Sequence, residues 1–227
     1  DSQGNVYLVG YMVGDPQYLE TFITSNAYQQ NYGGGERDGF VAKFSSEGLL
    51  IWSTFFGGTE NDAITAITIS QDRIFVGGAS SSGNMATVNA HQFALHGSED
   101  CFLSEFDTAG QRLWLTYYGG NLTDYVSGIQ SDGNGSIYIY GQTGSADGIA
   151  SPTGFDTMYI PTSGGEDDYT SFIAKFSDSG QNLLWGTYYG TNEGSRTSHI
   201  TGLALSPSGL YVAGAVFDLS PNPYFAT

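Results

Sequence analysis

Short stretches in which apolar and polar side chains alternate recur along the chain. Residues 63–70 read AITAITIS, so that Ile64 and Ala66 fall on one face and Ile67 and Ile69 on the other. Residues 125–130 and 200–205 alternate in the same way. A period of two residues is typical of a β-strand with one buried face. No segment has a convincing period of 3.6 residues, so the pattern predicts a protein built from strands.

Reversals between these strands are marked by Gly, Asn, Asp, Ser and Pro. Mixtures that contain such residues lie at 45–48, 70–73, 132–135 and 207–209. They favour tight turns, and glycine adopts a positive φ at little cost. We therefore expect hairpins at these four places.

Three elements repeat along the chain. A segment of about twenty residues recurs at 38–56, 100–118 and 170–189, and its tryptophans, Trp52, Trp114 and Trp185, are 62 and 71 residues apart. A weaker element is found at 26–29 and 89–92. An apolar run that ends in glycine occurs four times, with its last residue at Gly10, Gly78, Gly141 and Gly214. The repeat length is therefore sixty to seventy residues, which decides the architecture before any local assignment does.

Each repeat contains four short strands, which predicts an all-β fold made of β-propeller blades. We expect the end of one blade in residues 1–36 and three blades in 37–98, 99–168 and 169–227, with thirteen strands, or about three and a quarter blades, in one domain. An array of immunoglobulin-type sandwiches is the alternative, but its units run to about 100 residues. Since propellers have ~4–8 blades, we expect the remaining blades on the same chain or on a partner subunit.

The composition limits the classes of partner. Six Lys and Arg against 23 Asp and Glu give a net charge of −17, so general binding to nucleic acid or to anionic membranes is excluded. No stretch approaches the ~18 apolar residues of a membrane-spanning helix. The single cysteine, Cys101, cannot form an internal disulfide.

Three pieces of the sequence together resemble the SBBP repeat family, which is named for a seven-bladed β-propeller. They are DGFVAKF at 38–44, the tryptophan strand that ends in FGG at 56–58 or YGG at 118–120, and DSQGNVYLVG at 1–10. The chain departs from this pattern at Glu105, which replaces the lysine of Lys43 and Lys175, at Thr191, which replaces a glycine, and at the shortened turn 70–73.

The resemblance implies an extracellular or cell-surface bacterial protein, associated with the outer membrane and exported as cargo of the type IX secretion route. Asp107-Thr108-Ala109 and Asp156-Thr157-Met158 are similar to the motif that such bacteria O-glycosylate, with Thr108 and Thr157 as the acceptors.

Calcium is the one cofactor for which the sequence offers candidate ligands. The loop 132–136 contains Asp132, Asn134 and Ser136, and Asp62 and Asp124 follow two other glycine-rich segments. Calcium takes oxygen ligands of these kinds. A hairpin turn requires the same residue types, so both interpretations stay open.

No catalytic residue can be assigned from the sequence. Cys101 is expected to be a small buried residue, and the histidines at 91, 96 and 199 share no ligand spacing, with His91 in a packing position. Acidic residues precede the first strand of each unit, at 36–38, 99–100 and 166–168. One interpretation is an acidic rim that binds cations or a basic partner. The other is that these residues cap backbone amides at the ends of strands.

These observations favour a non-catalytic scaffold or adhesion module that binds a protein or a surface glycan. A calcium- or carbohydrate-binding lectin is one alternative, with the tyrosine pairs 117–118 and 188–189 as a platform unless they pack between blades. A glycan-active enzyme with paired carboxylates is the other. The insertion 145–165 is the expected place for specific binding, because variable loops on rigid scaffolds carry function.

Overall fold

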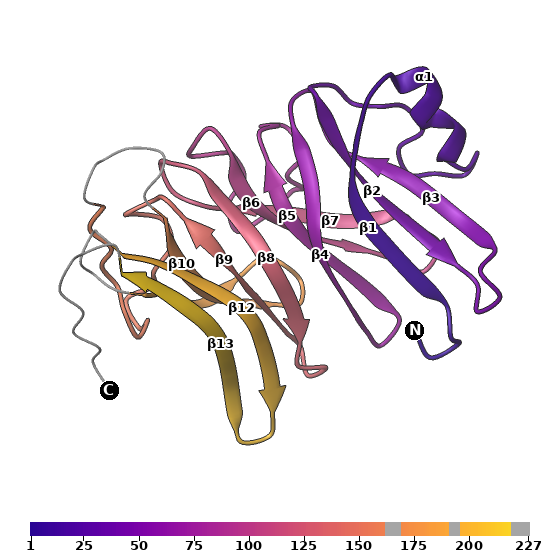
Figure 1. The fold of residues 1–227 in the computed structure, drawn as a ribbon. Helices are drawn as coiled ribbons and strands as arrows, with labels where there is room; N and C mark the ends of the chain where they lie inside the picture. The colour runs from indigo at the N-terminus through magenta and orange to yellow at the C-terminus, as the bar shows by residue number, and fades with distance from the viewer. Residues whose placement is uncertain (162–168, 191–195, 219–227) are drawn as a thin grey trace.

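The structure is a computed structural model that describes residues 1–161, 169–190 and 196–218 (Figure 1). The acidic segment 166–168 and Thr191 therefore lie outside the described residues. Thirteen strands are present in the described part, as expected. They are β1 (Val6–Val13), β2 (Arg37–Phe44), β3 (Leu50–Phe56), β4 (Asp62–Ser70), β5 (Arg73–Ser80), β6 (Asp100–Phe106), β7 (Arg112–Tyr118), β8 (Asp124–Ser131), β9 (Ser136–Thr143), β10 (Thr170–Ser177), β11 (Leu183–Tyr189), β12 (Arg196–Ser206) and β13 (Gly209–Asp218).

Two short helices, α1 (Pro16–Leu19) and η1 (Glu20–Phe22), lie in the segment after β1 and were not predicted. Each is a single turn or less, which is too short to produce a helical period in the sequence. No helix of the described residues is long and apolar enough to cross a membrane.

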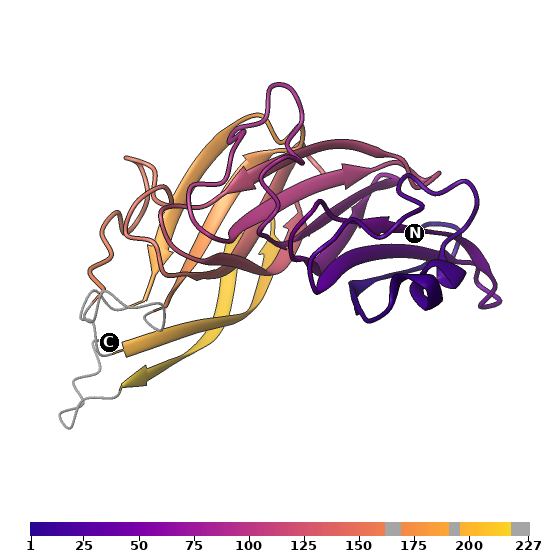
Figure 2. The same ribbon diagram turned by 90° about the horizontal axis from the view of Figure 1, so that it is seen from above.

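The strands form antiparallel sheets that follow one another in chain order along an arc (Figures 1 and 2). The first sheet has the order β1-β2-β3, the second β4-β5-β6-β7 and the third β8-β9-β10-β11, and β12 and β13 form a hairpin after them. β4, β8 and β12 are the inner edge strands of their sheets, and β8 lies between β4 and β12. The all-β class and the four-stranded antiparallel sheets are therefore confirmed, and they have the form of propeller blades.

The limits of the sheets differ from the expected blade limits at 37–98, 99–168 and 169–227. β3 pairs with β2, whereas β4 begins a new sheet by pairing with β5. Each sheet therefore takes its two inner strands from one repeat and its two outer strands from the next. The period of a repeat is the same whichever strand is counted first, so the sequence pattern could not place the boundary.

Apolar side chains fill the spaces between successive sheets. The tyrosines after each tryptophan belong to these interfaces: Tyr117 and Tyr118 have no exposed surface and Tyr188 has 2%. They pack between blades and are not available as a carbohydrate platform, although Tyr189 is 43% exposed. Three clusters are centred on Val41, Phe56, Phe102 and Tyr117, on Leu103, Tyr118, Phe172 and Tyr188, and on Ile173, Ile200 and Leu203.

Each of the first two tryptophans packs against a glycine turn of the following sheet. A Cβ atom at Gly110 would lie 2.8 Å from the ring of Trp52, and a Cβ atom at Gly180 would lie 2.3 Å from the ring of Trp114. The indole N–H of Trp52 also donates to the carbonyl of Thr108 at 3.0 Å. The tryptophan and the turn glycine that recur in the sequence thus form one contact between neighbouring sheets.

Candidate functional site

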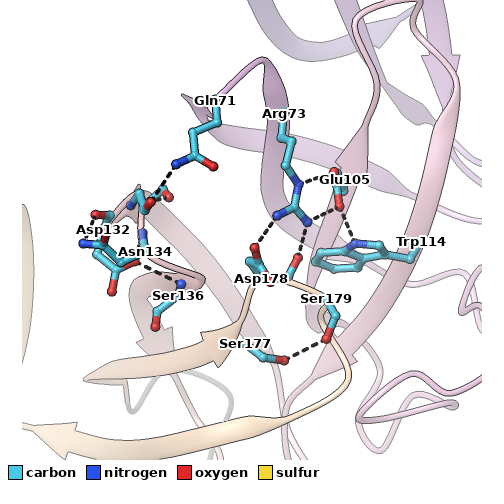
Figure 3. Close-up of polar contacts among 12 residues, drawn as sticks. Gln71, Arg73, Glu105, Trp114, Asp132, Asn134, Ser136, Ser177, Asp178 and Ser179 are labelled. Atoms are coloured by element: carbon cyan, nitrogen blue, oxygen red, sulfur yellow. Dashed lines mark hydrogen bonds and ion pairs between the residues drawn. The ribbon is translucent and has the colours of Figure 1, made fainter.

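Charged side chains gather where the hairpin tips of the second and third sheets meet (Figure 3). Arg73 on β5 donates two hydrogen bonds to Glu105 on β6, with Nε–Oε1 at 2.7 Å and Nη2–Oε2 at 2.9 Å. Arg73 also reaches the third sheet, where it contacts the carboxylate of Asp178 and donates to its carbonyl at 2.8 Å. Trp114 Nε1 donates to Glu105 Oε2 at 2.6 Å. The hydrogen bonds that Arg73 donates to Glu105 raise the pKa of Arg73, which stays charged.

This network explains why Glu105 departs from the repeat. In the first sheet the equivalent Lys43 lies 3.6 Å from Asp1 in the preceding turn. The turn before β5 is shortened to two residues, Gln71 and Asp72, both with positive φ, and it brings Arg73 beside Glu105. The sign of the ion pair is therefore reversed in the second sheet. The sequence contained the signal, a Lys-to-Glu change together with a shortened turn, but Arg73 was missed.

The carboxylate of Asp132, a candidate calcium ligand, is used by its own turn. Asp132 Oδ1 accepts hydrogen bonds from the amides of Asn134 at 2.8 Å and Ser136 at 3.0 Å. Asp1 and Asp107 accept the amides two and four residues ahead of them in the same way. In the described part of the chain, no group of three or more His, Cys, Asp or Glu side chains could hold a metal ion. The arrangement favours the hairpin-turn interpretation of Asp132, Asn134 and Ser136.

Calcium is consequently expected to leave the stability unchanged. Because Asp132 already accepts two backbone amides, 2 mM calcium should shift the melting temperature by less than ~1 °C, with EDTA as the reference. Asp132→Ala should cost about 1 kcal/mol with or without calcium, because the amides lose their acceptor. A calcium-dependent rise of several degrees that Asp132→Ala abolishes would contradict this interpretation. Differential scanning calorimetry measures both quantities.

Asp62 and Asp124, the other candidate ligands, occupy equivalent buried positions in the second and third sheets. Asp62 accepts the amide of Gly58 at 2.7 Å and the hydroxyls of Ser80 and Ser82 at 2.5 and 2.8 Å. Asp124 accepts the amide of Gly120 at 2.8 Å and the hydroxyls of two residues at the same relative positions, Thr143 and Ser145. Each carboxylate therefore links the glycine pair that follows one sheet to the segment that follows the first hairpin of the next sheet. For Asp62 the glycine pair is 57–58, and for Asp124 it is 119–120.

Two of the acidic residues expected at a rim, Asp38 and Asp100, are also buried. Asp38 and Asp100 have no exposed surface. Asp38 accepts the amide of Gly33 at 2.5 Å, and Asp100 accepts the amides of His96 and Gly97 and the side chain of Gln92. Caps for backbone amides are therefore the correct interpretation at these two positions. No acidic rim is formed by Asp38 and Asp100.

The buried carboxylates lie in pairs on either side of a glycine. A Cβ atom at Gly57 would be 2.4 Å from Asp38 Oδ1 and 2.9 Å from Asp62 Oδ2, and Gly119 lies between Asp100 and Asp124. Burial raises the pKa of Asp38 to about 6, and the charge of Asp62 adds to this increase. Burial raises the pKa of Asp124 to about 7, and Asp100 adds to it. A pKa in this range can suit an acid catalyst, but the same arrangement occurs twice and is held by structural hydrogen bonds.

These pKa values predict a protein that is more stable in mild acid. Because the folded-state pKa exceeds the unfolded value of about 3.9, the stabilising effect is complete below pH 4 and is lost as the pH rises towards 7. The melting temperature should therefore fall by ~5 °C or more between pH 5 and pH 8. Asp124→Asn should flatten this dependence, whereas Asp15→Asn, at an exposed position, should not. Equal slopes for the two variants in calorimetry would show that net charge alone causes the effect.

Cys101 and His91, the remaining candidates for a nucleophile and a functional histidine, make packing contacts. Cys101 is fully buried, and its burial raises the pKa of the thiol, as expected for a structural cysteine. His91 packs against Phe176 and Tyr118 with ring centroids 5.6 and 6.5 Å apart, and burial lowers its pKa. These ring contacts agree with the packing role predicted for His91, although the residue is exposed overall.

Exposed groups cluster instead in the insertion after β9. Phe155, Met158 and Ile160 are 89%, 63% and 60% exposed, while Tyr159 between them is buried against Tyr188, with ring centroids 5.8 Å apart. The side chain of Thr157 is exposed there, and so is that of Thr108 in the turn between β6 and β7. The described part of the insertion is thus anchored by one tyrosine and presents apolar groups around it.

The fold and these repeated contacts define an all-β repeat protein of stacked four-stranded antiparallel sheets. No family model matches the chain, so the resemblance to the SBBP repeat family stays a prediction. The chain is distantly homologous to the regulatory protein FlaEY of Caulobacter vibrioides, with 26% identity over 169 residues. The alignment covers 73% of this chain and 17% of the length of that protein.

Proposed function

We propose that this chain is a non-catalytic β-propeller segment of the SBBP type, which acts as a scaffold and interaction module of a secreted or cell-surface bacterial protein. The observation that carries the proposal is the repetition of its polar contacts. Asp62 and Asp124 make equivalent hydrogen bonds in successive sheets. Catalysis needs a unique constellation, whereas a scaffold needs the same contact in every blade. Further blades, on the same chain or on a partner subunit, would complete the ring.

The apolar side chains Phe155, Met158 and Ile160 are the best candidates for the contact with a protein or a surface glycan. They project from an insertion that Tyr159 anchors to the third sheet. Apolar groups exposed together on a rigid scaffold are typical of interaction sites. In this mechanism the sheets hold the insertion in place. Weak contacts at several loops then combine to give a higher overall affinity for the partner.

Photo-crosslinking on intact cells tests this role. p-Benzoylphenylalanine replaces Phe155 in the full protein on its native bacterium, and Val88, 82% exposed in the insertion after β5, serves as the matched control position. We expect a discrete adduct from position 155 and none from position 88. Phe155→Ala combined with Met158→Ala should lower cell-surface binding of the purified protein about tenfold. Adducts of equal yield at both positions would refute a specific contact at the insertion.

The glycan-active enzyme is the alternative that the paired carboxylates favour. Asp38 and Asp62 converge on Gly57 but are fully buried. We expect no release of reducing sugar from cellulose, chitin, xylan or peptidoglycan. Hydrolysis of any of these that Asp62→Asn abolishes without unfolding the protein would establish the enzyme instead.

Glycan analysis and protease accessibility test the proposed location at the cell surface. Thr108 and Thr157 are both accessible, as acceptors of O-linked glycans must be. Peptide mass spectrometry of the protein from its native source should find added hexose on one or both residues, and protease treatment of intact cells should remove the protein. Unmodified peptides, together with protection from protease, would remove the support for type IX export.

A further inference from the structure

A small polar pocket lies at the junction of the first and second sheets. It has a volume of about 150 Å³, and Tyr28, Asn84, Met85 and Arg112 are among the residues that line it. Tyr28 comes from the segment between β1 and β2, Asn84 and Met85 come from the insertion after β5, and Arg112 begins β7. Pockets for drug-sized molecules have volumes of ~300–1,000 Å³, so this pocket is suited to a single small unit.

Arg112 gives this pocket a positive charge that no side chain neutralises. Arg112 makes no hydrogen bond or ion pair with the described residues, and its guanidinium lies over the ring of Tyr28, 5.1 Å from the ring centroid. Arg37 and Arg73, by contrast, each form an ion pair with a glutamate. The chain has 23 Asp and Glu against six Lys and Arg. A guanidinium that has no acidic partner in such a chain can bind an acidic ligand.

Asn84 adds a second polar group with unused hydrogen-bonding capacity. Its side-chain amide makes no hydrogen bond with the described residues. Gly58 allows this amide to lie against the backbone, because a Cβ atom at Gly58 would be 2.8 Å from Asn84 Oδ1. The buried side chains of Phe56 and Met85 provide apolar walls. An amide both donates and accepts hydrogen bonds, so Asn84 can bind a hydroxyl group of a ligand that Arg112 holds by its acidic group.

The equivalent junction between the second and third sheets has different side chains. There Asp147 takes the place of Asn84 and lies against Gly120. Leu183 takes the place of Arg112 in the register of the outer hairpin. The second junction therefore carries an acid and no guanidinium at these two positions. The combination of Arg112 and Asn84 is a departure from the repeat, which indicates a specific role and not a contact that every blade requires.

The charges around the pocket favour a ligand with a single negative charge. Gly57 lines the pocket, and its Cβ position is 2.4 Å from Asp38 Oδ1 and 2.9 Å from Asp62 Oδ2. These carboxylates repel an anion, and the repulsion grows with the charge of the anion. A carboxylate carries one charge, which Arg112 alone balances, and its two oxygens match the planar guanidinium. A phosphate carries a charge of about −1.5 to −2 at pH 7 and would leave an excess of negative charge.

We propose that this pocket binds a uronic acid residue of a glycan. The guanidinium of Arg112 donates to the sugar carboxylate, and the amide of Asn84 bonds to a neighbouring hydroxyl group. The ring of Tyr28, a residue that is 38% exposed, offers apolar surface to the sugar at the rim of the pocket. The proposal does not rest on the contact proposed for Phe155, which belongs to the insertion after β9, so the failure of one leaves the other standing.

Isothermal titration calorimetry of the whole chain with sodium glucuronate tests the proposal. We expect glucuronate to bind at least about tenfold more tightly than glucose or the uncharged methyl ester of glucuronic acid, because only glucuronate pairs with Arg112. Arg112→Gln should lower the affinity for glucuronate at least about tenfold, and Asn84→Ala should lower it about threefold. Arg37→Gln is the matched control, since it removes the same charge from a guanidinium that is already paired, and it should leave the affinity unchanged.

A second measurement observes Arg112 directly in the unaltered chain. The Nε–H resonance of Arg112 in NMR spectra should shift with glucuronate and not with glucose, and the melting temperature of Arg112→Gln shows whether that variant is folded. The proposal is overturned if glucuronate does not bind, if it binds without shifting the Arg112 resonance, or if folded Arg112→Gln binds it as tightly. Acetate that binds as tightly as glucuronate would overturn the assignment to a sugar, and phosphate that binds more tightly would overturn the assignment to a carboxylate.

Discussion

Arg73→Met is expected to lower the free energy of unfolding by about 3–5 kcal/mol, because it leaves a buried carboxylate without its counter-ion. The side chain of Glu105 is 4% exposed, and Arg73 is the charged partner with which it forms a bidentate pair. Glu105→Met should cost less, since Arg73 is 35% exposed and keeps its contact with Asp178. Chemical denaturation followed by tryptophan fluorescence measures each variant.

The double variant separates the ion pair from general packing. Arg73→Met with Glu105→Met should be more stable than Arg73→Met alone, because no unpaired charge remains, and the coupling should be about 2 kcal/mol. Arg37→Met is the matched control, since its pair with Glu99 is 36% and 21% exposed and should contribute less than about 1 kcal/mol. Additive losses at Arg73 and Glu105 would contradict the reversed ion pair.

Gly110→Ala is expected to destabilise the protein by about 3 kcal/mol, through a clash between neighbouring sheets. The new Cβ atom would lie 2.8 Å from Trp52, in a residue with a φ of +83°. The left-handed backbone costs an alanine about 1 kcal/mol, and displacing the packed indole adds about 1–3 kcal/mol. Gly180→Ala should behave similarly, because its Cβ atom would lie 2.3 Å from Trp114.

Gly48→Ala isolates the backbone contribution. Gly48 has a φ of +81° in the equivalent turn of the first sheet, and nothing lies within 4 Å of its Cβ position. Its replacement should cost only about 1 kcal/mol. Losses of equal size at Gly48 and Gly110 would mean that the contact between tryptophan and turn does not stabilise the stack. The near-ultraviolet circular dichroism of Trp52 should change in Gly110→Ala but not in Gly48→Ala.

The candidate site was predictable only in part. The sequence identified Asp62, Asp124 and Asp132 as oxygen donors but could not say what they bind. The structure gives Asp62 and Asp124 partners about twenty residues away, Ser82 and Ser145. The Lys-to-Glu change at Glu105 and the shortened turn were visible in the sequence, but the second partner of Arg73, Asp178, is 105 residues distant and belongs to another sheet. Contacts of this kind leave no local pattern in the chain.

The sequence by itself determined the strands, the turns and the repeat length. These features depend on local preferences, such as the alternation of residues 63–70 and the positive φ at Gly48 and Gly110. Only the tertiary structure decided which strands share a sheet and how the sign of the Glu105 ion pair reverses. The physical reason is that backbone hydrogen bonds between strands are made by every residue type, so the pairing of β4 with β5 and not with β3 follows from the packing of distant segments.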